Sequence, residues 1–209
     1  MHSHSARGFL PAAGHDWFLP LYDPFTKLLG IAKAHRALIA QASLGSNDRV
    51  LEVGCGTGNL VLLLKKLRPG ADVVGLDPDA KALSRARKKA LRASVSIQFD
   101  EGFADAMPYE DDSFDRVLSS FMFHHLEDKT PALREIRRVL KPGGRLELLD
   151  FAGHDDRIPF KWLHAHQQLH DNSEAHVLGF LREAGFADPK KLSEHSLLLG
   201  RSAYYQAPK

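Results

Sequence analysis

The feature that most constrains this chain is the run Val50-Leu51-Glu52-Val53-Gly54-Cys55-Gly56-Thr57-Gly58. Its first residues are mainly apolar and predict a short strand that is covered on both faces of a parallel sheet. Three glycines follow at alternate positions, and a residue without a Cβ lets the backbone turn tightly and approach a ligand closely. The next stretch, residues 59–67, predicts a helix whose first N–H groups point at whatever lies over the loop. The run therefore predicts a nucleotide-type cofactor site on an open α/β sheet.

The glycine spacing and a second acid narrow the kind of cofactor. Dinucleotide-binding loops follow the pattern G-x-G-x-x-G, which would place its third glycine at Asn59, whereas this loop has the pattern G-x-G-x-G. A second apolar run, residues 73–76, ends in Asp77, which lies 19 residues past Gly58. A carboxylate at the tip of a second strand can accept hydrogen bonds from both ribose hydroxyls. Because NAD-binding proteins share such an acid, Asp77 alone does not distinguish the two kinds of cofactor.

Four further segments follow in the order and spacing of one family. They are Gly102–Pro108, Asp112–Leu118, Ser119–Leu126 and Glu135–Leu146. With the glycine loop, they resemble the methyltransferase type 11 family of class I S-adenosylmethionine-dependent methyltransferases, which includes the ubiquinone/menaquinone-biosynthesis C-methyltransferases. The resemblance covers residues 49–150 closely. It implies S-adenosyl-L-methionine as the cofactor and S-adenosyl-L-homocysteine as its product.

The resemblance also implies the residues that hold the cofactor. The three loop glycines would lie under its methionine and ribose parts. Glu52 would orient its amino group, and Asp77 would accept the ribose hydroxyls. The alternative for Glu52 is a structural acid that accepts hydrogen bonds from loop N–H groups. The full set implied in this way is Glu52, Gly54, Cys55, Gly56, Gly58, Asp77, Pro78, Phe103, Ala104, Ser119 and Tyr22.

Phe103 departs from the family pattern, in which many members have an aspartate that hydrogen-bonds the adenine amino group. A phenyl ring can pack on the base but cannot make that bond. We therefore expect the backbone groups of Phe103 and Ala104, rather than a side chain, to contact the edge of the adenine.

His124 follows the fourth predicted strand, where family members place residues near the reacting methyl group. Imidazole titrates near neutral pH, so His124 is the candidate general base. The alternative is a packing histidine, because in-line methyl transfer does not require a base. The reaction needs no metal either, and we predict no metal site.

The composition indicates a single domain with a balanced charge. The chain has 209 residues, with 28 basic and 26 acidic side chains and a formal charge of +2. This balance gives no indication of nucleic acid or an anionic membrane as a partner. The single cysteine, Cys55, cannot form an internal disulfide, so we expect a reducing cytoplasm. No apolar run is long enough to span a bilayer.

The alternation of strand and helix patterns predicts an α/β fold. We expect a Rossmann-like, mostly parallel sheet of seven strands with an antiparallel C-terminal hairpin strand and helices on both faces. The strands are predicted near 49–53, 72–76, 95–99, 114–120, 144–150, 190–196 and 201–206. The helices are predicted near 25–42, 58–67, 79–91, 129–139 and 173–184.

We expect the chain to divide into an N-terminal helical lid or substrate segment, residues 1–45, and the class I methyltransferase domain, residues 46–209. The acceptor pocket is expected to be built by two segments outside the central motifs, of which residues 1–45 are the first. The pair Tyr22-Asp23 resembles one found in the lid of quinone-type enzymes. The alternative for this segment is an ordinary helix that packs on the sheet, because apolar spacing does not separate the two. The second pocket segment is residues 151–172.

These observations predict an enzyme that transfers a methyl group to a small-molecule acceptor at oxygen, nitrogen or carbon. The alternatives are a regulatory or assembly module that binds the cofactor without methyl transfer, and an aminopropyl transferase on the same fold. The sequence after the fourth strand, Ser119-Ser120-Phe121-Met122, lacks the Asn/Asp-Pro-Pro-aromatic motif of enzymes that methylate base amines. We therefore predict no nucleic acid partner, and the sequence does not indicate an oligomeric state.

Overall fold

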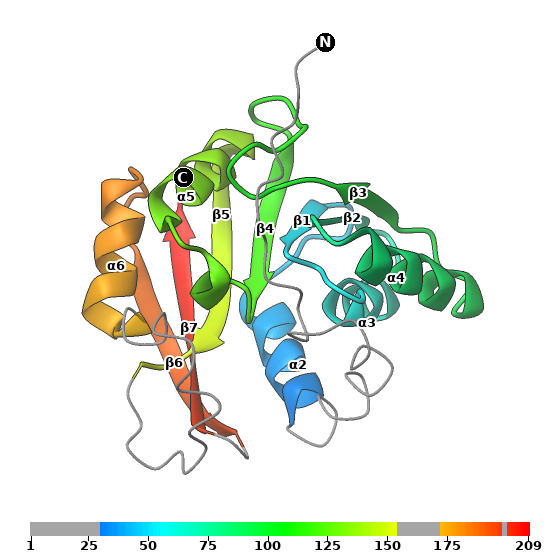
Figure 1. Ribbon diagram of the computed structural model, residues 1–209, viewed down its shortest axis with the longest axis horizontal. Helices are drawn as coiled ribbons and strands as arrows, with labels where there is room; N and C mark the ends of the chain where they lie inside the picture. Colours follow the sequence, from blue (N-terminus) through cyan, green and yellow to red (C-terminus); the bar gives the residue numbers. More distant parts are fainter. Residues whose placement is uncertain (1–29, 154–171, 198–199) are drawn as a thin grey trace.

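A single sheet of seven strands organises the computed structural model, which describes residues 30–153, 172–197 and 200–209. Its order is β3-β2-β1-β4-β5-β7-β6. The strands are β1 (Arg49–Val53), β2 (Asp72–Asp77), β3 (Gln98–Glu101), β4 (Phe114–Ser120), β5 (Leu140–Phe151), β6 (Lys190–Leu197) and β7 (Gly200–Pro208). Strands β1 to β5 are parallel, whereas β7 lies antiparallel between β5 and β6, as the opposed arrows in Figure 1 show. This confirms the predicted fold class and the C-terminal hairpin.

Helices cover both faces of the sheet (Figure 1). They are α2 (Ile31–Gln41), α3 (Asn59–Leu67), α4 (Ala80–Arg92), the 3-10 helix η2 (Phe123–His125), α5 (Lys129–Val139) and α6 (Glu174–Glu183). Three of them begin at a side chain that accepts hydrogen bonds from the first turn: Asp79 for α4, Asp128 for α5 and Ser173 for α6. Such caps satisfy backbone donors that have no partner within the helix.

The core lies in two layers because successive strand residues point to opposite faces. Leu51 of β1 packs with the layer formed by α5 and α6, and its neighbour Val50 packs with the layer formed by α2, α3 and α4. Both side chains are fully buried. A strand covered on both faces in this way accounts for the unbroken apolar runs in the sequence.

Two strands differ from their predicted ranges by three or more residues at one end. The third was predicted near 95–99, but β3 spans Gln98–Glu101. Val95 and Ile97 are only partly buried and pack against the core from the loop that precedes the strand. Strand β5 begins at Leu140, earlier than predicted, because Leu140 pairs with Phe114 before the ladder shifts register and resumes at Arg145. Residues 140–143 therefore lie before the predicted range of 144–150.

Helix α2 begins at Ile31, and the start of the predicted helix at residue 25 lies outside the described residues. Its buried residues Leu38 and Ile39 belong to the same layer as α3 and α4, and the Tyr204 hydroxyl donates to the Ala34 carbonyl at 3.2 Å. The described part of the N-terminal segment is therefore attached to the sheet. No helix among residues 30–153, 172–197 and 200–209 is long and apolar enough to cross a membrane.

The strand order places the glycine loop at a distinctive point. The chain steps from β1 to β2 to β3 in one direction and then returns to β4 on the other side of β1. In open α/β sheets, ligands bind outside the carboxyl ends of the strands where the order reverses in this way. Here that point lies between β1 and β4.

Candidate functional site

The glycine loop leaves β1 and is held against the end of β2. The N–H groups of Gly54 and Cys55 donate to the Leu76 carbonyl at 2.8 and 3.0 Å. The N–H of Gly56 donates to Asp77 Oδ2 at 2.7 Å. All three glycines have positive φ, at 74° for Gly54, 52° for Gly56 and 79° for Gly58. The sequence therefore needs glycine here for its backbone conformation.

The surroundings of the three glycines differ. A Cβ on Gly54 would collide with the Met122 side chain, and a Cβ on Gly58 would lie 2.9 Å from the Cβ of Ala86 in α4. A Cβ on Gly56 would meet no atom within 4 Å. The loop is thus packed by protein at its two ends and open at its middle glycine, where a ligand could approach the backbone.

Asp77 binds the loop as well as ending its strand. Besides the bond to Gly56, its Oδ1 accepts from the N–H of Asp79 at 2.9 Å. Burial raises the pKa of Asp77, and the N–H groups of Asp79 and Gly56 act in the opposite direction. Each carboxylate oxygen has two lone pairs, so both retain capacity to accept a ligand hydroxyl.

Glu52 is 3% exposed and lies beneath the start of α3. Its Oε2 accepts from the N–H of Val61 at 3.0 Å, one of the helix donors that has no partner within α3. Burial raises the pKa of Glu52 well above its ordinary value. In this position Glu52 fixes the end of β1 to the start of α3, which fits the structural alternative.

Lys89 of α4 provides positive charge near Glu52. Its Nζ donates to Thr57 Oγ1 at 3.1 Å and to Asn59 Oδ1 at 2.8 Å. The lysine therefore ties α4 to the junction between the loop and α3. Its charge lowers the pKa of Glu52, against the larger effect of burial.

Cys55 packs toward the sheet. A Cβ on Gly75 of β2 would lie 2.8 Å from its Sγ, and the thiol is buried and free. Burial raises the pKa of Cys55 well above its ordinary value. A buried thiol that holds its proton is a poor nucleophile, so its side chain acts in packing.

Ser119 carries a buried polar atom without a partner. It is 1% exposed and pairs with Val53, the residue immediately before the glycine loop. Its Oγ has no hydrogen-bond partner in the described part of the chain. An orphaned hydroxyl of this kind is uncommon in a folded protein, and it marks a place where a bound group could supply the missing bond.

The remaining predicted cofactor residues lie beside the loop or outside the described ranges. Pro78 lies between Asp77 and the capping residue of α4, and Phe103 and Ala104 follow β3. Phe103 forms a single bridge with Ala106 and is partly buried, as is Ala104. Tyr22 lies outside the described residues.

His124 makes a close pair with an acid that the sequence analysis missed. Its Nδ1 lies 2.7 Å from Asp150 Oδ1, and its backbone N–H donates to Asp150 Oδ2 at 3.2 Å. Asp150 ends an apolar run on β5 and is 1% exposed. An imidazole that donates from Nδ1 to a carboxylate carries its lone pair on Nε2, where it can accept a proton. The signal in the sequence was an acid at the end of a buried strand, the same signal that identified Asp77.

A second histidine reaches the end of β4 from α2. His35 Nε2 lies 2.9 Å from Ser120 Oγ, and burial lowers the pKa of His35 to about 4. The next residue, Phe121, has a φ of 52°, which is strained for an aromatic side chain. Its ring lies 4.9 Å from that of Phe151 at the end of β5, centroid to centroid. Aromatic and histidine side chains therefore gather at the carboxyl ends of β4 and β5.

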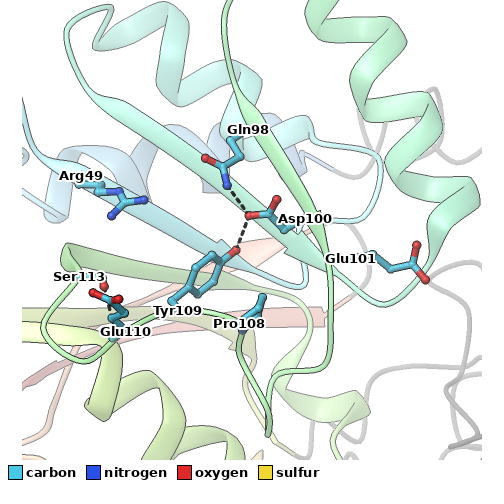
Figure 2. Close-up of a pocket in the computed structure, with 8 residues that line it drawn as sticks. All are labelled: Arg49, Gln98, Asp100, Glu101, Pro108, Tyr109, Glu110 and Ser113. Atoms are coloured by element: carbon cyan, nitrogen blue, oxygen red, sulfur yellow. Dashed lines mark hydrogen bonds between the residues drawn. The ribbon is translucent and has the colours of Figure 1, made fainter. Parts of the chain in front are cut away.

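Figure 2 shows a separate pocket of about 520 Å³ that contains none of the predicted site residues. Its lining residues are Arg49, Gln98, Asp100, Glu101, Pro108, Tyr109, Glu110 and Ser113. Asp100 Oδ2 accepts from Gln98 Nε2 at 2.7 Å and from the Tyr109 hydroxyl at 3.0 Å, whereas Glu101 points away from them (Figure 2). Burial and then the adjacent Asp100 raise the pKa of Tyr109. The polar groups that face one another here are already paired, so the pocket is not the candidate site.

Comparison with known proteins identifies relatives of the central part of the chain. The family described as a methyltransferase domain matches residues 51–148. A demethylmenaquinone methyltransferase of Deinococcus radiodurans is 42% identical over 135 residues, which make up 63% of this chain and 56% of that protein. The chain thus spans little more than half the length of that relative.

A longer match comes from the ubiquinone/menaquinone biosynthesis C-methyltransferase UbiE of Xylella fastidiosa strain M12. It is 34% identical over 180 residues, which cover 83% of this chain and 69% of that protein. Among solved structures, a SAM dependent methyltransferase from Aquifex aeolicus matches with a TM-score of 0.67 and 21% identity, covering 88% of this chain and 91% of that one. At this identity the structural match supports the fold alone.

Proposed function

The chain belongs to the S-adenosylmethionine-dependent methyltransferase family that includes the ubiquinone/menaquinone biosynthesis C-methyltransferases, and from this membership we propose that it methylates a small aromatic acceptor. The observation that carries the proposal is the glycine loop at the reversal of strand order, with the N–H of Gly56 held by Asp77 and open space above Gly56. A cytoplasmic location is part of the proposal, since the only cysteine is free and buried.

Three features of the chain fit this cofactor. The open backbone at Gly56 could lie under the bound molecule, and Asp77 retains lone pairs for two ribose hydroxyls. The orphaned hydroxyl of Ser119 could complete its hydrogen bonding with a polar group of the cofactor. We further propose that Glu52, Gly54, Gly58, Cys55, Pro78, Phe103, Ala104 and Tyr22 border the cofactor, as the family pattern implies.

When bound, S-adenosylmethionine supplies a methyl group on a positively charged sulfur, which is already electrophilic. The chain therefore needs to align the acceptor and keep water away. A general base assists where the acceptor must lose a proton. We propose that His124 accepts the acceptor's proton at Nε2, while Asp150 holds the ring in the required tautomer and stabilises the charge that forms. If the acceptor is a phenol or hydroquinone, loss of this proton raises the electron density of its ring or oxygen.

The aromatic character of the acceptor rests on two observations. The rings of Phe121, Phe151 and His124 follow one another, with centroids 4.9 and 5.3 Å apart. The relatives are named as methyltransferases of quinone biosynthesis. Residues 1–45 are proposed to border the same acceptor, because His35 of α2 reaches Ser120 at the end of β4.

The first test is calorimetric titration with S-adenosylhomocysteine, with NAD as the control. We expect micromolar binding of the former and none of NAD. Methyl transfer from labelled S-adenosylmethionine to a hydroquinone, a simple phenol and an amine then identifies the acceptor class. Binding of S-adenosylhomocysteine without transfer to any acceptor would favour the binding-module alternative, and binding of NAD alone would refute the cofactor assignment.

A further inference from the structure

The charge of this chain is unevenly distributed despite its near balance overall. Residues 59–71, which contain α3, and residues 80–98, which contain α4, hold nine lysines and arginines and no acid. The formal charge is therefore +9 on these two segments and −7 on the remainder, which together give the chain's +2. The formal charge of the whole chain therefore does not reveal that the segments of α3 and α4 are strongly basic.

Helices α3 and α4 lie beside each other on one face of the sheet (Figure 1). Each starts after a parallel strand and returns toward the start of the next one, so both C-terminal ends lie at the amino edge of the sheet. Each end also exposes a leucine next to basic residues. Leu91 is 80% exposed and Leu67 is 37% exposed, and they are two of the three large apolar side chains that the described residues expose.

Several of the bases have no neutralising partner. Lys66, Arg85, Lys88 and Arg92 make no ion pair within the part of the chain that the structure describes. Along α4, Arg85 stands three residues from Lys88, which stands four from Arg92. Like charges at these spacings repel and destabilise an isolated helix. A helix surface with several basic side chains that make no ion pair within the described residues is well suited to bind an anion from outside the protein.

We propose that this surface, defined by Lys66, Leu67, Arg85, Lys88, Leu91 and Arg92, docks the protein onto a bilayer that contains anionic phospholipids. Lipid headgroups would contact the four bases, and the two leucines would enter the boundary below the headgroups. The segments contain no aromatic residue on which a nucleic acid base could stack, and exposed leucines have no role in phosphate binding. The proposal concerns a different face from the glycine loop and does not depend on methyl transfer.

Co-sedimentation of the full chain with vesicles tests the proposal. We expect binding to phosphatidylcholine vesicles that contain phosphatidylglycerol, weak binding to pure phosphatidylcholine, and a decline as salt is raised. The double variant K88Q/R92Q should bind about 25-fold more weakly, at about fivefold for each base. Leu91→Ser should weaken binding about tenfold while leaving the charge unchanged.

The matched control is R134Q/R182Q, which removes the same charge from exposed positions on α5 and α6, on the opposite face. Its vesicle binding should stay within about twofold of the original, because the attraction to anionic lipids acts mainly on bases that lie near the membrane surface. Circular dichroism and S-adenosylhomocysteine titration report whether each variant is folded. Equal binding to neutral vesicles, an equal loss in the control pair, or tighter binding to a DNA duplex at the same salt would each overturn the proposal.

Discussion

Replacing Gly56 by alanine tests whether the cofactor lies over the open middle of the glycine loop. Gly56 has a φ of 52°, and an added Cβ would meet no atom of the protein within 4 Å. The substitution therefore creates no collision in the protein itself. It introduces backbone strain, and it places a methyl group in the space where we propose that the cofactor lies.

The two effects differ in size and can be separated. An alanine held in the left-handed region costs about 1–2 kcal/mol of folding stability, or a fall in Tm of about 2–8 °C for a chain of this length. A methyl group in a closely fitted interface adds about 1–3 kcal/mol to the binding free energy. Gly56→Ala should thus weaken S-adenosylhomocysteine binding by about fivefold to 150-fold.

Gly143→Ala provides the matched control. Gly143 also has a positive φ, 78°, and an added Cβ would likewise meet nothing within 4 Å, but it lies in β5, where the pairing with β4 shifts register between Leu140 and Arg145. Thermal unfolding should show similar losses of stability for the two variants, while calorimetry should show weakened binding for Gly56→Ala alone. Unchanged affinity in Gly56→Ala, or an equal loss in Gly143→Ala, would refute the placement of the cofactor over Gly56.

Three further substitutions address other parts of the site. Ser119→Ala should leave stability nearly unchanged, because its buried hydroxyl has no partner, but should weaken S-adenosylhomocysteine binding about threefold to tenfold by calorimetry. Asp150→Asn should lower kcat about 100-fold with little change in KM, because His124 loses its carboxylate partner; an unchanged kcat in the methyl transfer assay would show that no base operates there. The pKa of His35 is about 4 in the folded protein and about 6.5 when unfolded, so the unfolded chain binds an extra proton between these values and stability falls as the pH is lowered. Through His35, the free energy of unfolding should fall by about 2 kcal/mol between about pH 7.5 and pH 5, and this fall should be absent in His35→Gln when both proteins are unfolded in urea. An identical pH dependence of the free energy of unfolding in both proteins would contradict this.

The glycine loop shows what sequence alone can establish. The run from Val50 to Gly58 predicted a buried strand, a turn that needs positive φ, and a helix, and all three are local properties of the backbone. The third strand was misplaced because the alternating residues Val95 and Ile97 pack from a loop, and only tertiary contacts distinguish that arrangement from a strand. Which cofactor residues touch the ligand stays a prediction.

The pair of His124 and Asp150 shows where local reasoning stops. The two residues lie 26 positions apart, and nothing near either one indicates the other. Their meeting follows from strand order: an acid at the end of a parallel strand faces the loop of the neighbouring strand. Asp77 at the end of β2 binds the loop after β1, and Asp150 at the end of β5 binds the turn after β4. Once β4 is placed between β1 and β5, the acid that ends the apolar run of β5 is expected to bind the turn that follows β4. The strand order is therefore the additional information that is needed to predict the pair of His124 and Asp150 from the sequence.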